Sequence, residues 1–154
     1  MGDGNGWTRC AVGHRHWGRF GAAGLLVTDG TGVLLQHRAA WTHEGDTWAV
    51  PGGARDSSET AVEAALREAA EETSLDPRTV QPFAAWTDDH RGWSYTTIVA
   101  VTAARTPVVP VNTESCAVRW WAFDDVAGLR LHLGFAVAWP HLRGLVEGVS
   151  RPGS

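Results

Sequence analysis

The segment 53–75, GARDSSETAVEAALREAAEETSL, constrains the chain more than any other part of the sequence. Its apolar residues recur every three or four positions up to Thr73, which is the spacing of an amphipathic α-helix. Ser57 or Ser58 is expected to cap the start of this helix, with Glu59 or Glu63 in its first turns. The apolar face consists of Val62, Ala65, Leu66, Ala69 and Ala70. We therefore predict a helix that packs one face on a core and exposes the other.

Three glutamates, Glu68, Glu71 and Glu72, crowd one face of this predicted helix. Their i, i+3, i+4 spacing places the three carboxylates within an arc of about 100°. Like charges at such spacings destabilise a helix by roughly 0.2–0.5 kcal/mol per pair, so a shared cation explains their grouping. Hard oxygen ligands favour Mg²⁺ or Mn²⁺. The spacing alone leaves a bland alternative open, a solvated face on which Glu63 and Arg67 form an ordinary ion pair.

The wider spacing resembles the Nudix box, in which a glycine, a glutamate, an Arg-Glu pair and a Glu-Glu pair stand at fixed offsets. The matching positions are Gly53, Glu59, Arg67, Glu68, Glu71, Glu72 and Leu75, with Ala69 as a small aliphatic. Ser74 departs from the motif, which has glycine there, and this puts the loop geometry at the helix end in doubt. The flanking segments WTHEGDTWAVPGG and VRWWAFDDV also resemble the family, so the resemblance covers most of residues 20–146.

The resemblance implies a role for each matching residue. Glu68, Glu71 and Glu72 would bind Mg²⁺ or Mn²⁺, together with the Gly53 carbonyl, and Arg67 and Glu59 would pair to fix the loop against the helix. Metal-activated water would then attack phosphorus in a diphosphate linkage. The general base would be Glu68 or, as second choice, Glu114 on a later loop, where the alternative is a merely solvated side chain.

The rest of the sequence predicts one α/β (α+β) domain. Residues 20–28 and 33–38 are expected to form a hairpin about the turn 29–32, and strands are expected at 80–87, 94–102 and 116–123. A second helix is expected at about 134–146, with Pro140 in its first turn or at a kink. The order predicts a mixed or antiparallel sheet sandwiched by helices over residues 20–147, and the resemblance implies an α/β/α sandwich with a mixed central sheet. An irregular arm, 1–19, would precede it and a tail, 148–154, would follow.

Substrate-binding residues are expected outside the glutamate helix. Arg38 resembles an arginine that contacts phosphate in some relatives, although an exposed arginine on a strand explains it equally well. The loop 88–95 carries His90, Trp93 and Tyr95, whose flat faces could stack on the non-phosphate end of a substrate. The alternative is that Trp93 and Tyr95, two residues apart, share one face of a strand and pack inward.

Composition narrows the class of substrate. A formal net charge of -4 gives no basic face for long nucleic acid, so a small nucleotide or nucleotide derivative is the expected partner. The sequence has no run of about 20 apolar residues, which predicts no membrane span and a cytoplasmic protein. Cys10 and Cys116 make no disulfide framework and are expected to be reduced. A homodimer is compatible with the sequence.

The predicted function is therefore metal-dependent hydrolysis of a diphosphate linkage in a nucleoside diphosphate derivative or nucleoside triphosphate. One alternative is a non-catalytic Nudix-fold domain that binds nucleotides or a protein, disfavoured because every metal-ligand glutamate is present. Another is isomerisation of an isoprenoid diphosphate, for which neither cysteine has a suitable setting. The motif indicates diphosphate chemistry and leaves the groups on either side open.

Overall fold

The computed structural model describes residues 3–9, 15–41, 45–105, 108–110 and 115–149. Its strands are β1 (Trp7–Arg9), β2 (Arg15–Trp17), β3 (Ala22–Thr28), β4 (Gly32–Arg38), β5 (Trp48–Ala49), β6 (Gly52–Ala54), β7 (Val80–Asp89), β8 (Ser94–Thr102) and β9 (Ser115–Ala122). Its helices are α1 (Ala61–Thr73), the short 3-10 helix η1 (Pro77–Thr79), α2 (Phe123–Val126) and α3 (Leu133–Glu147). The predicted strands and both long helices are present, with ends shifted by a few residues.

The central sheet is mixed and has the order β5-β4-β3-β8-β7, with β6 added to β3 and β9 added to β4. Strand β3 runs parallel to β8 along its whole length, but it pairs with β4 only where Thr28 meets Val33. At its start β3 pairs instead with β6, the strand that leads toward α1. The predicted hairpin is therefore closed only at its turn, because the two strands separate to admit β6.

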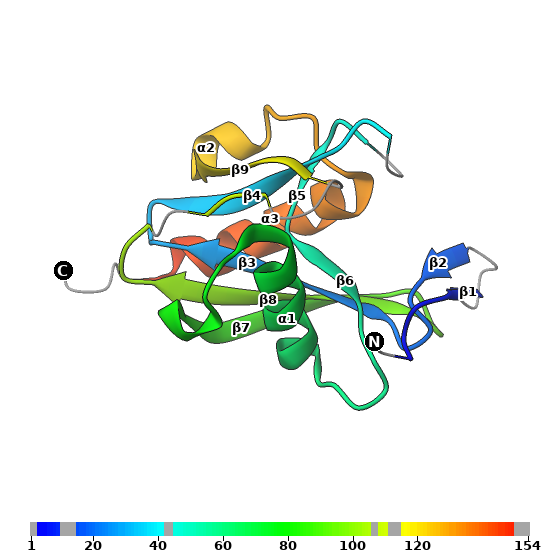
Figure 1. Cartoon of the computed structure of the whole chain (residues 1–154). Helices are drawn as coiled ribbons and strands as arrows, with labels where there is room; N and C mark the ends of the chain where they lie inside the picture. The colour runs from blue at the N-terminus through cyan, green and yellow to red at the C-terminus, as the bar shows by residue number, and fades with distance from the viewer. Residues whose placement is uncertain (1–2, 10–14, 42–44, 106–107, 111–114, 150–154) are drawn as a thin grey trace.

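Two apolar cores lie on opposite faces of this sheet, and Figure 1 shows α1 in front of it and α3 behind. Alternate residues of β3 serve the two cores, since successive side chains of a strand point to opposite faces. Ala23, Leu25 and Val27 pack with the alanines of α1, whereas Leu26 packs with residues of α3 such as Trp139. The predicted α/β/α sandwich is confirmed.

The start of α1 differs from the prediction. Thr60, and neither Ser57 nor Ser58, caps the helix, because its side chain accepts a hydrogen bond from the Glu63 amide. The Glu63 carboxylate in turn accepts from the Thr60 amide at 3.0 Å, which completes a capping box. Ser57 and Ser58 belong to the loop before the helix. In the second long helix, Pro140 lies in the interior of α3 rather than in its first turn.

The N-terminal segment also differs from the prediction of an irregular arm. Strands β1 and β2 form a separate two-stranded antiparallel sheet in which Trp7 faces Trp17 in register. Backbone hydrogen bonds join the residues just after β2 to those just before β1, from the Gly18 amide to the Gly6 carbonyl and from the Arg19 amide to the Gly4 carbonyl. Among the described residues, no helix is both long and apolar enough to cross a membrane.

Candidate active site

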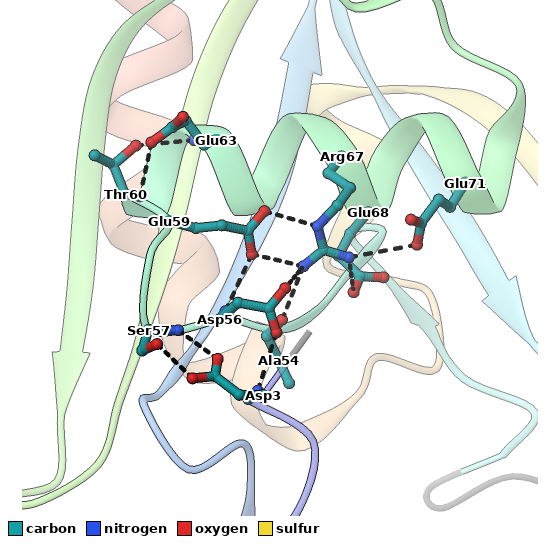
Figure 2. A network of polar contacts seen from close by, with 11 residues as sticks. Asp3, Ala54, Asp56, Ser57, Glu59, Thr60, Glu63, Arg67, Glu68 and Glu71 are labelled. Carbon is teal, nitrogen blue, oxygen red and sulfur yellow. Dashed lines mark hydrogen bonds and ion pairs between the residues drawn. The ribbon is translucent and has the colours of Figure 1, made fainter. Parts of the chain in front are cut away.

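The guanidinium of Arg67 lies at the centre of a polar network between α1 and the loop before it (Figure 2). Its Nε donates to Glu59 at 2.7 Å, and its Nη2 donates to the other Glu59 oxygen at 2.8 Å and to the Ala54 carbonyl at 3.1 Å. Its Nη1 donates to Glu68 at 3.0 Å and to Glu71 at 3.4 Å. One side chain therefore joins the loop to the helix, and the predicted pairing of Arg67 with Glu59 is present.

The negative charge around Arg67 exceeds the single positive charge of its guanidinium. The hydrogen bonds from Arg67 outweigh burial and hold the pKa of Glu59 at about 2, so Glu59 is ionised at neutral pH. Hydrogen bonds with Glu59 and the charge of Glu68 raise the pKa of Arg67 above its ordinary value. Asp56 lies 3.7 Å from the same guanidinium. Four carboxylates thus surround one cation.

The Glu68 carboxylate lies close against the backbone of β6. Its side chain is 16% exposed, and burial raises its pKa despite the nearby Arg67 charge. A Cβ atom on Gly53 would lie 2.6 Å from the Glu68 carboxyl carbon, so no larger residue fits there without movement. The glycine of β6 therefore allows the backbone to approach the Glu68 carboxylate directly.

Glu72 and Glu71 differ in their environment although they are neighbours. Glu72 is 8% exposed, and its carboxylate accepts a hydrogen bond from the Gly52 amide at 3.0 Å. The Glu71 side chain is 58% exposed, and its carboxylate accepts a hydrogen bond from Arg67. The three glutamates thus extend from the backbone of β6 outward to solvent along α1.

The N-terminal segment closes one side of the site, as Figure 2 shows. The Asp3 carboxylate accepts hydrogen bonds from the amide and hydroxyl of Ser57, and the Gly4 amide donates to Asp56 at 3.0 Å. A cavity of about 700 Å³ lies between this segment, the loop and α1. Its lining includes Asp3, Asn5, Asp56, Glu59, Arg67, Glu68 and Glu71.

The carboxylate oxygens at this site are ligands that a hard divalent cation prefers. Among the described residues, no three or more His, Cys, Asp or Glu side chains are already arranged to hold a metal ion. Glu68 and Glu71 both reach the same Nη1 of Arg67, so their carboxylates are close enough to share one cation. The ligands available are carboxylate oxygens without sulfur or imidazole, which is the chemistry that Mg²⁺ and Mn²⁺ prefer.

Two of the predicted substrate residues lie near the glutamates. Burial is the main cause that raises the pKa of the Tyr95 hydroxyl. The charges of Glu72 and Glu68 raise this pKa further, and the charge of Arg38 lowers it. The Tyr95 hydroxyl also lies against the backbone of Gly52, where a Cβ atom would approach it to 2.5 Å. Tyr95 packs against the core on the α3 side, as the inward-packing alternative predicted, and its hydroxyl lies within electrostatic range of Glu72 and Glu68.

The other predicted substrate residues lie elsewhere. His90 and Trp93 are on the turn that joins β7 to β8, with ring centroids 5.6 Å apart. Trp93 lines a second cavity and is absent from the lining of the glutamate cavity. Glu114 lies outside the described residues, so its role stays a prediction.

Two contributors to the site, Asp56 and Asp3, were not predicted from the sequence. Asp56 stands at a variable position of the box, and no residue spacing sets it apart from other loop acids. Asp3 contacts Ser57 across 54 positions of sequence, a separation at which local patterns give no signal. The cap at Thr60 did have a signal, the Thr60-x-x-Glu63 spacing of a capping box.

Comparison with known proteins agrees with this geometry. The family model described as the NUDIX domain matches residues 18–142. A Mycobacterium tuberculosis protein named "Putative 8-oxo-dGTP diphosphatase 3" is 47% identical, over 92% of this chain and 70% of that protein. The crystal structure of a Nudix hydrolase from M. smegmatis, RenU, is 43% identical with a TM-score of 0.88, covering 96% of this chain and 98% of that one.

A more distant structure shares the fold. A C. elegans Ap4A hydrolase in a binary complex superposes with a TM-score of 0.68 at 19% identity, covering 83% of this chain and 99% of that one. The match of the family model over most of the chain, and the relatives above 40% identity, settle the family. The chain belongs to the Nudix family and is a Nudix hydrolase, an enzyme class that cleaves pyrophosphate linkages in nucleotide derivatives.

Proposed function

We propose that this enzyme uses a divalent metal, Mg²⁺ or Mn²⁺, to hydrolyse a phosphoanhydride bond in a nucleoside triphosphate or nucleoside diphosphate derivative. The observation that carries the proposal is the excess of carboxylates around Arg67 in a cavity of about 700 Å³. A polyphosphate would be repelled by Glu59, Glu68 and Glu71 unless additional positive charge came with it.

Glu68, Glu71 and Glu72, together with the Gly53 carbonyl, would hold the metal. When bound there, a divalent cation neutralises phosphate charge and lowers the pKa of a bound water. Arg67 and Glu59 would act as positioning residues, because their bonds hold the loop and α1 at a fixed separation. Nudix hydrolases generally use a divalent metal, and this chain supplies the oxygen ligands for one.

Glu68 is our first choice as the general base, because its carboxylate lines the cavity and is held against Gly53. Glu114 is the second choice. Whichever of the two is the base would take a proton from the attacking water. The anhydride oxygen on the far side of phosphorus would leave with the other phosphate group. Arg38 would contribute a guanidinium to a substrate phosphate, close to Tyr95.

The substrate we place first is a nucleoside triphosphate with an oxidised purine base. This choice rests on the name carried by the M. tuberculosis relative, which is 47% identical over most of both chains. ADP-ribose, nucleotide sugars and dinucleoside polyphosphates are the competitors, since the glutamate helix handles only the phosphates.

The test is a substrate panel with Mg²⁺ or Mn²⁺. The enzyme is incubated with 8-oxo-dGTP, dGTP, ADP-ribose and diadenosine tetraphosphate, and nucleotide, phosphate and pyrophosphate products are separated by chromatography. We expect a nucleoside monophosphate and pyrophosphate from 8-oxo-dGTP at a higher kcat/KM than from dGTP. Hydrolysis of ADP-ribose alone would overturn the oxidised triphosphate as substrate in favour of a nucleoside diphosphate derivative, and no hydrolysis of any compound would support a non-catalytic binding domain.

A further inference from the structure

A second cavity, of about 320 Å³, lies between the residues just before β3 and the turn that joins β7 to β8. Figure 1 shows the end of β7 and the start of β8 next to the start of β3, where Ala22 pairs with Tyr95. The cavity lining includes Arg19, Phe20, Arg55, Asp89 and Trp93, and it contains none of the glutamates of α1. Its volume is on the scale of a small-ligand site.

The backbone around this cavity is held by several contacts. The Arg55 amide donates to the Gly21 carbonyl at 3.0 Å, and the Arg19 amide donates to the Gly4 carbonyl at 2.8 Å. Gly21 has a φ of 89°, and a Cβ atom there would lie 2.8 Å from the Ser94 carbonyl. This close packing brings the two arginines and the β7–β8 turn to the same cavity.

The two arginines give the cavity an affinity for anions. The Nε of Arg55 is buried and has no hydrogen-bond partner among the described residues. A buried donor without an acceptor is unfavourable, so Arg55 gains a hydrogen bond if its side chain turns toward an acceptor in the cavity. Arg19 adds a second guanidinium on an exposed side chain. Guanidinium groups bind phosphate through paired hydrogen bonds.

The remaining lining favours a nucleotide over a simple anion. Trp93 and Phe20 offer aromatic faces, and Phe20 is 44% exposed. Asp89 provides a carboxylate, which repels an isolated phosphate but accepts hydrogen bonds from the N–H groups of a base. A ligand with a flat ring, N–H donors and a phosphate therefore meets all three kinds of side chain.

This cavity is separate from the glutamate cavity. Ala54 and Asp56 line the glutamate cavity, whereas Arg55 between them lines the second one. Gly4 packs against the Arg55 carbonyl, so the N-terminal segment also lies at this boundary. We propose that the second cavity is an accessory nucleotide site that binds a nucleoside monophosphate without a metal. This proposal does not depend on the function proposed above.

The test is isothermal titration of the full chain with GMP in EDTA, where the acidic glutamate cavity repels anions. We expect saturable binding that is about tenfold weaker in Arg55→Gln and in Arg19→Gln, partly retained in Arg55→Lys, and a few-fold weaker in Trp93→Ala. Arg78→Gln is the matched control, because Arg78 is exposed and pairs with Asp76. Thermal melting of each variant shows whether it is folded.

Three results would overturn the proposal. These are absence of GMP binding in EDTA, equal weakening by Arg55→Gln and Arg78→Gln, and binding of inorganic phosphate as tight as that of GMP. A fourth would reassign Trp93: if Trp93→Ala raised KM for hydrolysis while metal-free GMP binding stayed unchanged, Trp93 would contact the substrate itself. Failure of the enzyme to hydrolyse any nucleotide would leave all of these binding results interpretable.

Discussion

Two arginines, Arg67 and Arg105, bind carboxylates in different parts of the molecule, and their surroundings differ in charge balance. Arg105 lies 2.8 Å from Asp29 at the turn between β3 and β4, and its guanidinium also lies over the Trp120 ring at 5.0 Å. In that pair, one positive charge faces one negative charge. Arg67 instead faces Glu59, Glu68, Glu71 and Asp56.

The difference separates a structural ion pair from a functional site. Asp29 has all its negative charge satisfied locally, since Thr31 and Gly32 also donate to it. Around Arg67 the carboxylates exceed the cations, which is unfavourable for stability alone. We infer that the surplus is retained because a metal ion balances it, and balances the charge of the substrate phosphates, when the enzyme works.

The largest expected effect is on turnover at the glutamates. Glu72→Gln or Glu71→Gln should lower kcat by roughly a hundredfold or more, because transition-state charge loses the stabilisation that a bound metal provides. Asp29→Asn is the control at the matched ion pair and should keep wild-type kcat while lowering the melting temperature. Steady-state kinetics at saturating Mg²⁺ measures both. Wild-type kcat in both glutamine variants would remove the metal-ligand assignment.

The next effect compares the two arginines directly. Arg67→Ala should lower the free energy of unfolding by about 2–4 kcal/mol and kcat by roughly tenfold or more, because Glu59 and Glu68 lose their partner and the loop is released. Arg105→Ala should lower stability by about 1 kcal/mol, since its side chain is 44% exposed, and should leave kcat unchanged. Urea unfolding and kinetics on both variants are the measurements. A loss of kcat in Arg105→Ala equal to that in Arg67→Ala would refute the distinction.

Acid should weaken both regions. The pKa of Glu59 is held at about 2 mainly by Arg67, and that of Asp29 at about 2 by hydrogen bonds that outweigh its burial. Because both values are depressed, their stabilisation is fully present above the unfolded pKa near 4 and is lost as pH falls toward 2. Each should contribute roughly 2–3 kcal/mol.

Urea unfolding between pH 6 and pH 2.5 measures this loss. Glu59→Gln and Asp29→Asn should each flatten the decline and should start from a lower stability at pH 6. A wild-type stability that stays constant over this range would contradict the two pKa values.

The smallest effect concerns Ser74, at the end of α1, which stands where the Nudix box has glycine. Ser74 adopts the left-handed conformation that glycine favours, with φ 60° and ψ 9°. Ser74→Gly should therefore raise stability by about 0.5–1 kcal/mol and leave kcat unchanged. A thermal melt compares it with Ser58→Gly, an exposed loop position. A lower melting temperature in Ser74→Gly would show that contacts of the hydroxyl, such as that with the Val109 amide at 3.4 Å, outweigh the backbone strain.

The glutamate helix could be predicted from sequence because its information is local. Apolar spacing places its buried face, and the offsets among Glu59, Arg67 and Glu68 place the ion pairs within one helix and its loop. The insertion of β6 beside β3 and the docking of Asp3 on Ser57 depend on contacts between distant segments. Sequence patterns do not encode these contacts, so the splayed hairpin, the ordered ribbon and the second cavity appear only in the structure.

A Mn²⁺ titration followed by electron paramagnetic resonance of the free ion tests directly whether the glutamates of α1 bind a metal. The carboxylate surplus around Arg67 predicts saturable binding of Mn²⁺ to the wild-type protein. Binding should weaken roughly tenfold or more in Glu71→Gln and Glu72→Gln, and it should be retained in Asp29→Asn. Equal Mn²⁺ affinity in all four proteins, or hydrolysis by a wild-type enzyme that binds no Mn²⁺ or Mg²⁺, would show that these glutamates do not hold a catalytic metal.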